Sequence, residues 1–193
     1  MTFVAGRSIF VLLLIFHMAD ALYCQPVWTF DCDQQGWGTR THFNNFEVTY
    51  LPFGMGNPSG SITFRHTGSD YENWLFAPVK NRINAEINKH VYFSLELADA
   101  GTIPKAGVNA LFVWISDSVA GTLRTKNFKI FSGSQVYHLD LSADPNWKGI
   151  VEISRFHFPS GDQRSQGYVP DKARYFMDWF ACTGNVAFSS PAQ

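Results

Sequence analysis

Residues 27–37, VWTFDCDQQGW, and residues 175–182, YFMDWFAC, are two short aromatic runs, each interrupted by aspartate and cysteine. Aromatic residues in short runs are typical of β-strands, where their side chains pack on a pleated, half-buried surface. One run stands near the start of the folded part of the chain and the other near its end. We predict that they are the first and last strands of one β-sandwich and that they pair antiparallel.

The chain between these two runs has the pattern of many short strands. Residues 90–97 alternate most clearly, with Val91, Phe93, Leu95 and Leu97 on one face and Tyr92, Ser94 and Glu96 on the other. This alternation predicts an antiparallel strand with one buried face. Further strands are expected at residues 46–51, 61–66, 74–77, 110–115, 127–131, 136–141 and 150–158, and only residues 79–88 could form a short helix. The pattern predicts an all-β sandwich or barrel in one domain, residues 22–193.

The N-terminus has the features of a secretion signal. Arg7 precedes an apolar run at residues 9–16, and Ala19-Asp20-Ala21 fits the small-x-small rule for signal peptidase. The apolar run is much shorter than the roughly 20 residues that span a bilayer. We therefore predict a signal peptide at residues 1–21 and a secreted, extracellular protein. The formal net charge of -1 argues against nucleic acid or a membrane as the partner.

The chain has 3 cysteines, so one pair and one leftover thiol are expected in an oxidising compartment. If the terminal strands pair antiparallel, the start of the first lies beside the end of the last. This arrangement favours a disulfide between Cys24 and Cys182 and leaves Cys32 as a free thiol or an intermolecular link. A disulfide between Cys32 and Cys182 is the alternative.

The order of several short motifs resembles that of galactose-binding-like jelly-roll domains of the carbohydrate-binding-module type. The motifs are WTFD at residues 28–31, GW at 36–37, GSI at 60–62, GSD at 68–70, FVWI at 112–115, YHLDL at 137–141, WKG at 147–149, ISR at 153–155 and MDW at 177–179. Where the family has an aspartate-proline pair after the ISR motif, this chain has HFP at residues 157–159. The resemblance implies an all-β, jelly-roll β-sandwich of two antiparallel sheets that binds a glycan or polysaccharide.

Sugar recognition needs exposed aromatic faces and a few fixed polar groups. The candidate ligand-binding residues are Asp70, Tyr71, Asn73 and Trp74 in one loop, Tyr92, Trp114 and Arg124 on a sheet face, and Trp147 in a third place. For each of these rings the alternative is a position in the core, which is also where we expect Trp28, Trp37 and Trp179.

The resemblance also implies a structural calcium ion between the first and last strands. Pairing of these strands would bring Asp31, Asp33 and Asp178 together, and calcium prefers carboxylate and carbonyl oxygens as ligands. The alternative is that these aspartates are solvated or cap turns.

Enzyme signatures are weak in this sequence. It contains no Gly-x-Ser-x-Gly elbow, phosphate loop or HExxH motif. We therefore expect a secreted, non-catalytic domain that binds a glycan. Two alternatives stay open. One is a structural extracellular-matrix protein of a skeletal or shell matrix, with other matrix proteins as partners. The other is a jelly-roll carbohydrate-active enzyme that uses a pair of carboxylates.

Overall fold

The computed structural model describes residues 27–30, 32–39, 46–52, 60–66, 74–98, 103–117, 122–158 and 173–184. These residues form strands and loops without a helix, and all strand pairs are antiparallel. Accordingly, this part of the chain has no helix that is long and apolar enough to cross a membrane. Residues 79–88, where a short helix was possible, form a short strand and two turns instead.

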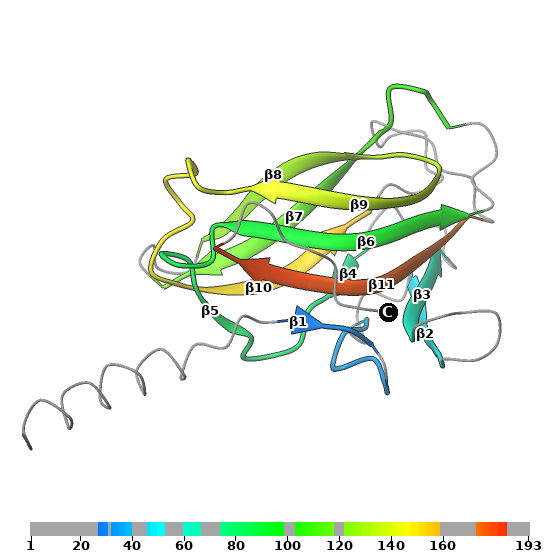
Figure 1. Cartoon of the computed structure of the whole chain (residues 1–193), viewed down its shortest axis with the longest axis horizontal. Coiled ribbons are helices and arrows are strands. Elements are labelled where there is room, and N and C mark those ends of the chain that lie inside the picture. The colour runs from blue at the N-terminus through cyan, green and yellow to red at the C-terminus, as the bar shows by residue number, and fades with distance from the viewer. Residues whose placement is uncertain are drawn as a thin grey trace, which may run out of the picture.

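The strands form two sheets that lie as layers (Figure 1). The six-stranded sheet has the order β2 (Phe46–Leu51), β3 (Ser61–His66), β11 (Arg174–Thr183), β6 (His90–Ala98), β9 (Gly133–Asp140), and the short β1 (Val27–Trp28) also pairs with β11. The five-stranded sheet has the order β4 (Trp74–Phe76), β10 (Ile150–His157), β7 (Val108–Ser116), β8 (Leu123–Ile130), and β5 (Arg82–Asn84) also pairs with β10.

The chain crosses repeatedly from one sheet to the other. Strand β6 lies in the six-stranded sheet, β7 and β8 in the five-stranded sheet, β9 again in the first, β10 in the second and β11 in the first. Such crossing between two packed antiparallel sheets is typical of a jelly roll. The predicted all-β, jelly-roll β-sandwich is confirmed.

The N-terminal described stretch, residues 27–39 without residue 31, is called the opening stretch, and it connects the two sheets. Strand β1 pairs antiparallel with β11, as predicted, and Trp28 lies opposite Phe180. The chain then turns at Gly36, whose φ of 81° lies in the left-handed region that glycine adopts without strain. Two residues later, Gly38 donates to the Phe76 carbonyl at 3.1 Å and accepts from the Phe76 N–H at 2.8 Å. Since Phe76 belongs to β4, the stretch is hydrogen-bonded to both layers.

A cluster of aromatic rings fills the space between the layers. The ring of Phe156 on β10 lies with its centroid 5.0 to 6.0 Å from those of Trp37, Phe93, Phe112 and Phe180. All five side chains are at most 1% exposed. Aromatic pairs at such distances add about 0.5–1.5 kcal/mol to the free energy gained by burying their surface. The two sheets are therefore joined by rings from the opening stretch and four strands.

Cys182 and Cys32 are both free thiols, the first buried in the core and the second exposed. Neither the predicted disulfide between Cys24 and Cys182 nor the alternative between Cys32 and Cys182 is therefore supported. Cys182 lies on the inner face of β11, opposite Val91, and its side chain is fully buried. Burial raises the pKa of the Cys182 thiol and keeps it protonated. Cys24 lies outside the described residues.

We predict that Phe156→Ala lowers the free energy of unfolding by about 3–5 kcal/mol, because the substitution opens a cavity at the centre of the aromatic cluster. Denaturant unfolding measures this loss. Val136→Ala is the control, since Val136 is 61% exposed, and it should change stability by less than about 0.5 kcal/mol. Similar losses in the two variants would contradict the position assigned to Phe156.

Candidate functional site

The candidate site lies on the outer face of the six-stranded sheet, the face that points away from the core. Strand β6 alternates as predicted and turns Tyr92 and Ser94 to this face. The edge strand β9 pairs with β6 and places His138 directly opposite Tyr92 and Asp140 opposite His90. Residues that stand opposite each other on antiparallel strands project to the same side of the sheet. Aromatic, imidazole and carboxylate groups therefore share one surface.

The rings of Tyr92 and His138 form a stack. Their centroids are 4.3 Å apart and their planes differ by only 3°. Tyr92 is 7% exposed and packs with Trp179 and Ala181 in a small cluster separate from the main core. His138 is exposed. The stack thus presents the imidazole of His138 to the surroundings and uses Tyr92 as its support.

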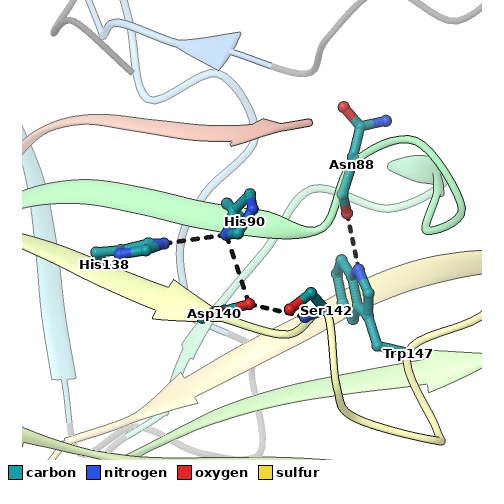
Figure 2. A network of polar contacts seen from close by, with 6 residues as sticks. All are labelled: Asn88, His90, His138, Asp140, Ser142 and Trp147. Carbon is teal, nitrogen blue, oxygen red and sulfur yellow. Dashed lines mark hydrogen bonds and ion pairs between the residues drawn. The ribbon is translucent and has the colours of Figure 1, made fainter. Parts of the chain in front are cut away.

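His90 joins this stack to a carboxylate, as Figure 2 shows. Its Nδ1 lies 3.1 Å from Nε2 of His138 and 3.6 Å from Oδ1 of Asp140. The same carboxylate accepts a hydrogen bond of 2.9 Å from the Ser142 N–H. One nitrogen of the histidine pair donates and the other accepts, so the contact cannot form when both rings are fully protonated.

The electrostatics of this network favour a neutral His138. Partial burial against its neighbours lowers the pKa of His138, the nearby His90 lowers it further, and Asp140 acts in the opposite direction. Hydrogen bonds from the side chain and backbone of Ser142 lower the pKa of Asp140, which therefore keeps its negative charge.

Trp147 holds this part of the sheet in place. Its Nε1–H donates a buried hydrogen bond of 2.7 Å to the carbonyl of Asn88, just before β6 begins (Figure 2). Next to it, the Leu141 N–H donates to the Lys89 carbonyl at 3.0 Å. Since Trp147 is only 5% exposed, its predicted role as an exposed ligand-binding ring is wrong. Its bond to Asn88 instead helps to position His90.

A bulge in β11 adds a second polar group to the same face. The pairing of β11 with β6 shifts between Met177 and Trp179, so that Asp178 is the additional residue. One carboxylate oxygen of Asp178 accepts a hydrogen bond of 3.1 Å from the Ser94 hydroxyl. Burial raises the pKa of Asp178, the bond from Ser94 lowers it, and the neighbouring Glu96 raises it. Asp178 and Trp179 therefore both lie on the outer face beside Ser94.

Of the predicted loop residues, the structure describes Trp74, which lies on the other sheet. Trp74 is on β4 of the five-stranded sheet, opposite His157 of β10. The ring centroids of Trp74 and His157 are 4.4 Å apart, and the guanidinium carbon of Arg155 lies 4.0 Å from the Trp74 ring centroid. Asp70, Tyr71 and Asn73 lie outside the described residues, so their role stays a prediction.

Trp114 and Arg124 do not lie on an exposed sheet face. Trp114 is 1% exposed, packs in the main core and donates from Nε1 to the Asn146 carbonyl at 3.2 Å. The prediction that its ring is presented to a ligand is therefore wrong. Arg124 stands directly opposite Trp114 on the edge strand β8, and so projects to the same inner side. Of the predicted sheet-face residues, the structure leaves Tyr92 on an outer face.

The predicted calcium ligands are only partly described. Asp33 is exposed and accepts a hydrogen bond of 2.6 Å from the Gln35 N–H, which closes a local turn. Asp178 is bonded to Ser94 on the outer sheet face. Within the described ranges no three His, Cys, Asp or Glu side chains are grouped so that they could hold a metal ion. These residues alone do not fit a calcium site, and Asp31 lies outside them, so calcium stays a prediction.

Comparison with known proteins gave matches to solved structures alone. No family model and no curated protein matches the chain. The chain is similar to structures of family 29 carbohydrate-binding modules, three of them mutant forms, at 13%, 12% and 11% sequence identity. These matches cover 88%, 87% and 88% of this chain and 100% of each module, with a TM-score of 0.43 in every case. Because this TM-score is low, the assignment of the fold and of the candidate site is based on the strands and side chains described above.

We predict that the protein loses stability as the pH falls below 6.5, the ordinary pKa of histidine. Because the pKa of His138 is lowered in the folded protein, the unfolded chain binds more protons there in the window between 6.5 and the lowered value. Unfolding free energies measured over a pH series should show this slope, and His138→Gln should reduce it. His157→Gln, a histidine on the other sheet, is the matched control. An unchanged slope in His138→Gln would contradict the lowered pKa of His138, which burial causes first and His90 second.

Proposed function

We propose that this protein is a secreted, non-catalytic domain that binds a glycan or polysaccharide on the outer face of its six-stranded sheet. The observation that carries the proposal is the exposed His138 ring, which is stacked on Tyr92 and in contact with His90. Flat rings pack against the apolar faces of sugar rings, and fixed polar groups form hydrogen bonds with the hydroxyls. The site has both parts on three neighbouring strands, β9, β6 and β11.

The apolar part of the proposed site lies on β9. Val136 is 61% exposed, and it projects from the same face as His138 because the two are separated by one residue. A sugar ring placed over these side chains would contact the imidazole and the two methyl groups of valine. Its apolar face would leave water on binding, which favours the complex.

The polar part of the site lies on β6 and β11. Ser94 stands opposite Val136 in the pairing of β6 with β9, and Asp178 is bonded to Ser94. Glu96 follows on the same face of β6 and is exposed. Ionised carboxylates accept hydrogen bonds only, and sugar hydroxyls are good donors. These groups would therefore orient a ring that rests on β9.

The site needs little rearrangement to bind. The imidazole of His138 is held by its contacts with Tyr92 and His90, and the carboxylate of Asp178 is held by Ser94. Side chains that are already ordered lose little conformational freedom in the complex. A glycan therefore meets a surface that is largely formed beforehand.

Affinity electrophoresis through gels that contain different polysaccharides tests this proposal. The wild-type protein should be retarded by at least one polysaccharide, and His138→Ala should weaken that binding by about 2–10-fold, the loss expected for one ring stack. The gels are run with calcium chloride and with a chelator, so that a need for calcium is detected. Retardation by none of the polysaccharides in either condition would disprove the proposal.

His157→Ala is the matched control for this experiment. His157 lies beside Trp74 on the five-stranded sheet, so this substitution removes the same side chain from the opposite face. It should leave binding unchanged. If His157→Ala weakens binding and His138→Ala does not, the glycan binds near Trp74 and the site proposed here is wrong.

A role as a structural extracellular-matrix protein is the second candidate. The exposed free thiol of Cys32 favours it, because an accessible thiol could form an intermolecular disulfide. In that case the protein should remain with insoluble matrix until a reductant is added, and Cys32→Ser should be extracted without reductant. Extraction of both forms without reductant would contradict this role.

A further inference from the structure

The contact between His90 and His138 has a fixed direction, because Asp140 decides which ring carries the shared hydrogen. Nδ1 of His90 lies 3.1 Å from Nε2 of His138 and 3.6 Å from Oδ1 of Asp140 (Figure 2). An ionised carboxylate presents only lone pairs, so a bare Nδ1 on His90 would be repelled by it. His90 is therefore the donor and Nε2 of His138 the acceptor, which places the hydrogen of a neutral His138 on Nδ1.

Two contacts fix the neutral His138 ring at the surface. Tyr92 supports one face of the ring, with the centroids 4.3 Å apart and the planes 3° apart, and His90 donates a hydrogen bond to its edge. Tyr92 is itself fixed, since it is 7% exposed and packs against Trp179 and Ala181. Because His138 is exposed, a sugar would cover the face of the ring that does not contact Tyr92.

A proton added to His138 goes to Nε2, the nitrogen that accepts the hydrogen bond from His90. Two N–H groups would then face each other across 3.1 Å, so repulsion would replace the hydrogen bond. The charged ring also binds water more strongly than the neutral ring does. Covering it with the apolar face of a sugar therefore costs more free energy. Protonation of His138 thus opposes ring stacking in two ways, through the position of the ring and through its hydration.

Several other titratable groups share this outer face with His138. On β6, burial raises the pKa of the Tyr92 phenol, which therefore stays protonated in acid, and Glu96 is exposed. On β11, the Asp178 carboxylate is bonded to Ser94, and burial raises its pKa. Farther along the face, on β2, β3 and β11, stand the charged residues Glu47, Arg65 and Arg174. Since Asp178 also titrates in acid, a test has to separate its protonation from that of His138.

We propose that the pair of His90 and His138 is a proton-controlled switch, which lets the site bind its glycan near neutral pH and makes it release the glycan on acidification. The inference rests on the proposed glycan-binding function and names the regulation of that site. The glycan binds the neutral form of His138, so proton and glycan each weaken the binding of the other by the same factor. Only the His138 side chain has to move, because Tyr92 and His90 are buried.

Affinity electrophoresis over a pH series tests this switch, on a polysaccharide that retards the wild-type protein at neutral pH. The series runs from about pH 8 to about pH 5, the range in which histidine changes its charge. Below the pKa of His138 the affinity should fall by up to about tenfold per pH unit, because one proton competes with the ligand. Circular dichroism at each pH confirms that the protein is folded, and retardation should return at neutral pH. Histidine ring resonances measured by NMR over the same series give the pKa of His138, which should match the midpoint of the loss.

Two substitutions should move this midpoint in opposite directions. His90→Gln keeps an N–H donor for His138 but removes a group that lowers the pKa of His138, second to burial, so the midpoint should rise. Asp140→Asn removes a carboxylate that raises the pKa of His138, so the midpoint should fall. Neither neighbour causes the pKa shift of Asp178, which arises from burial, Ser94 and Glu96.

His157→Gln is the matched control variant. It removes a histidine from β10 of the other sheet and should leave the midpoint of the loss where it is in the wild-type protein.

The outcomes separate this inference from the function on which it rests. Equal affinity across the pH series, or a loss of binding only where the protein unfolds, would overturn the inference and leave the glycan-binding function standing. A midpoint that stays in place in both His90→Gln and Asp140→Asn would also overturn it, since a carboxyl group such as Asp178 would then cause the loss. Binding of no polysaccharide at any pH would overturn both.

Discussion

The pairing of β11 with three other strands is the constraint on which both the core and the candidate site depend. Strand β11 is hydrogen-bonded to β6 over its length and to β3 and β1 in its two halves. Its inner face supplies Phe180 to the aromatic cluster, and its outer face supplies Phe176 and Asp178 to the sheet surface. Without β11, strands β2 and β3 would lose their connection to β6 and β9, and the six-stranded sheet would divide into two parts.

The bulge in β11 explains how one strand serves both faces. In a regular strand, successive residues point to opposite sides, so Met177 and Trp179 would share the inner face. The additional residue at Asp178 breaks this alternation, and Trp179 joins Tyr92 and Ala181 outside the main core. Bulges that re-aim a side chain are common next to functional sites. Here the bulge places a partly buried carboxylate where Ser94 can bond it.

Much of the fold could be predicted from the sequence because its signals are local. The alternation at residues 90–97 identifies the inner and outer faces of β6 correctly, and the two terminal aromatic runs pair as expected. The position of Trp37 in the core is also confirmed. Successive side chains of a strand point to opposite faces, so apolar residues at every second position show which face is buried.

The rest could not be predicted because it depends on contacts between distant segments. Strand β7 is apolar on both faces, so the sequence alone does not tell that Phe112 and Trp114 face the core. Trp179 is buried, as predicted, but the bulge at Asp178 has no local signal, so the sequence does not tell that Trp179 packs with Tyr92 and Ala181 in a separate small cluster. The motif at residues 137–141 contains the alternation that exposes His138, but only its pairing with β6 shows that Tyr92 supports it.

The polar groups at the β9 edge of the outer sheet face satisfy one another, and this determines what the proposed glycan site would recognise. Around His90, donors and acceptors pair with each other, and the pKa shifts keep His138 neutral beside the Asp140 carboxylate. If the proposed glycan site is correct, a neutral ring in this position would discriminate between ligands by their shape and by ring stacking.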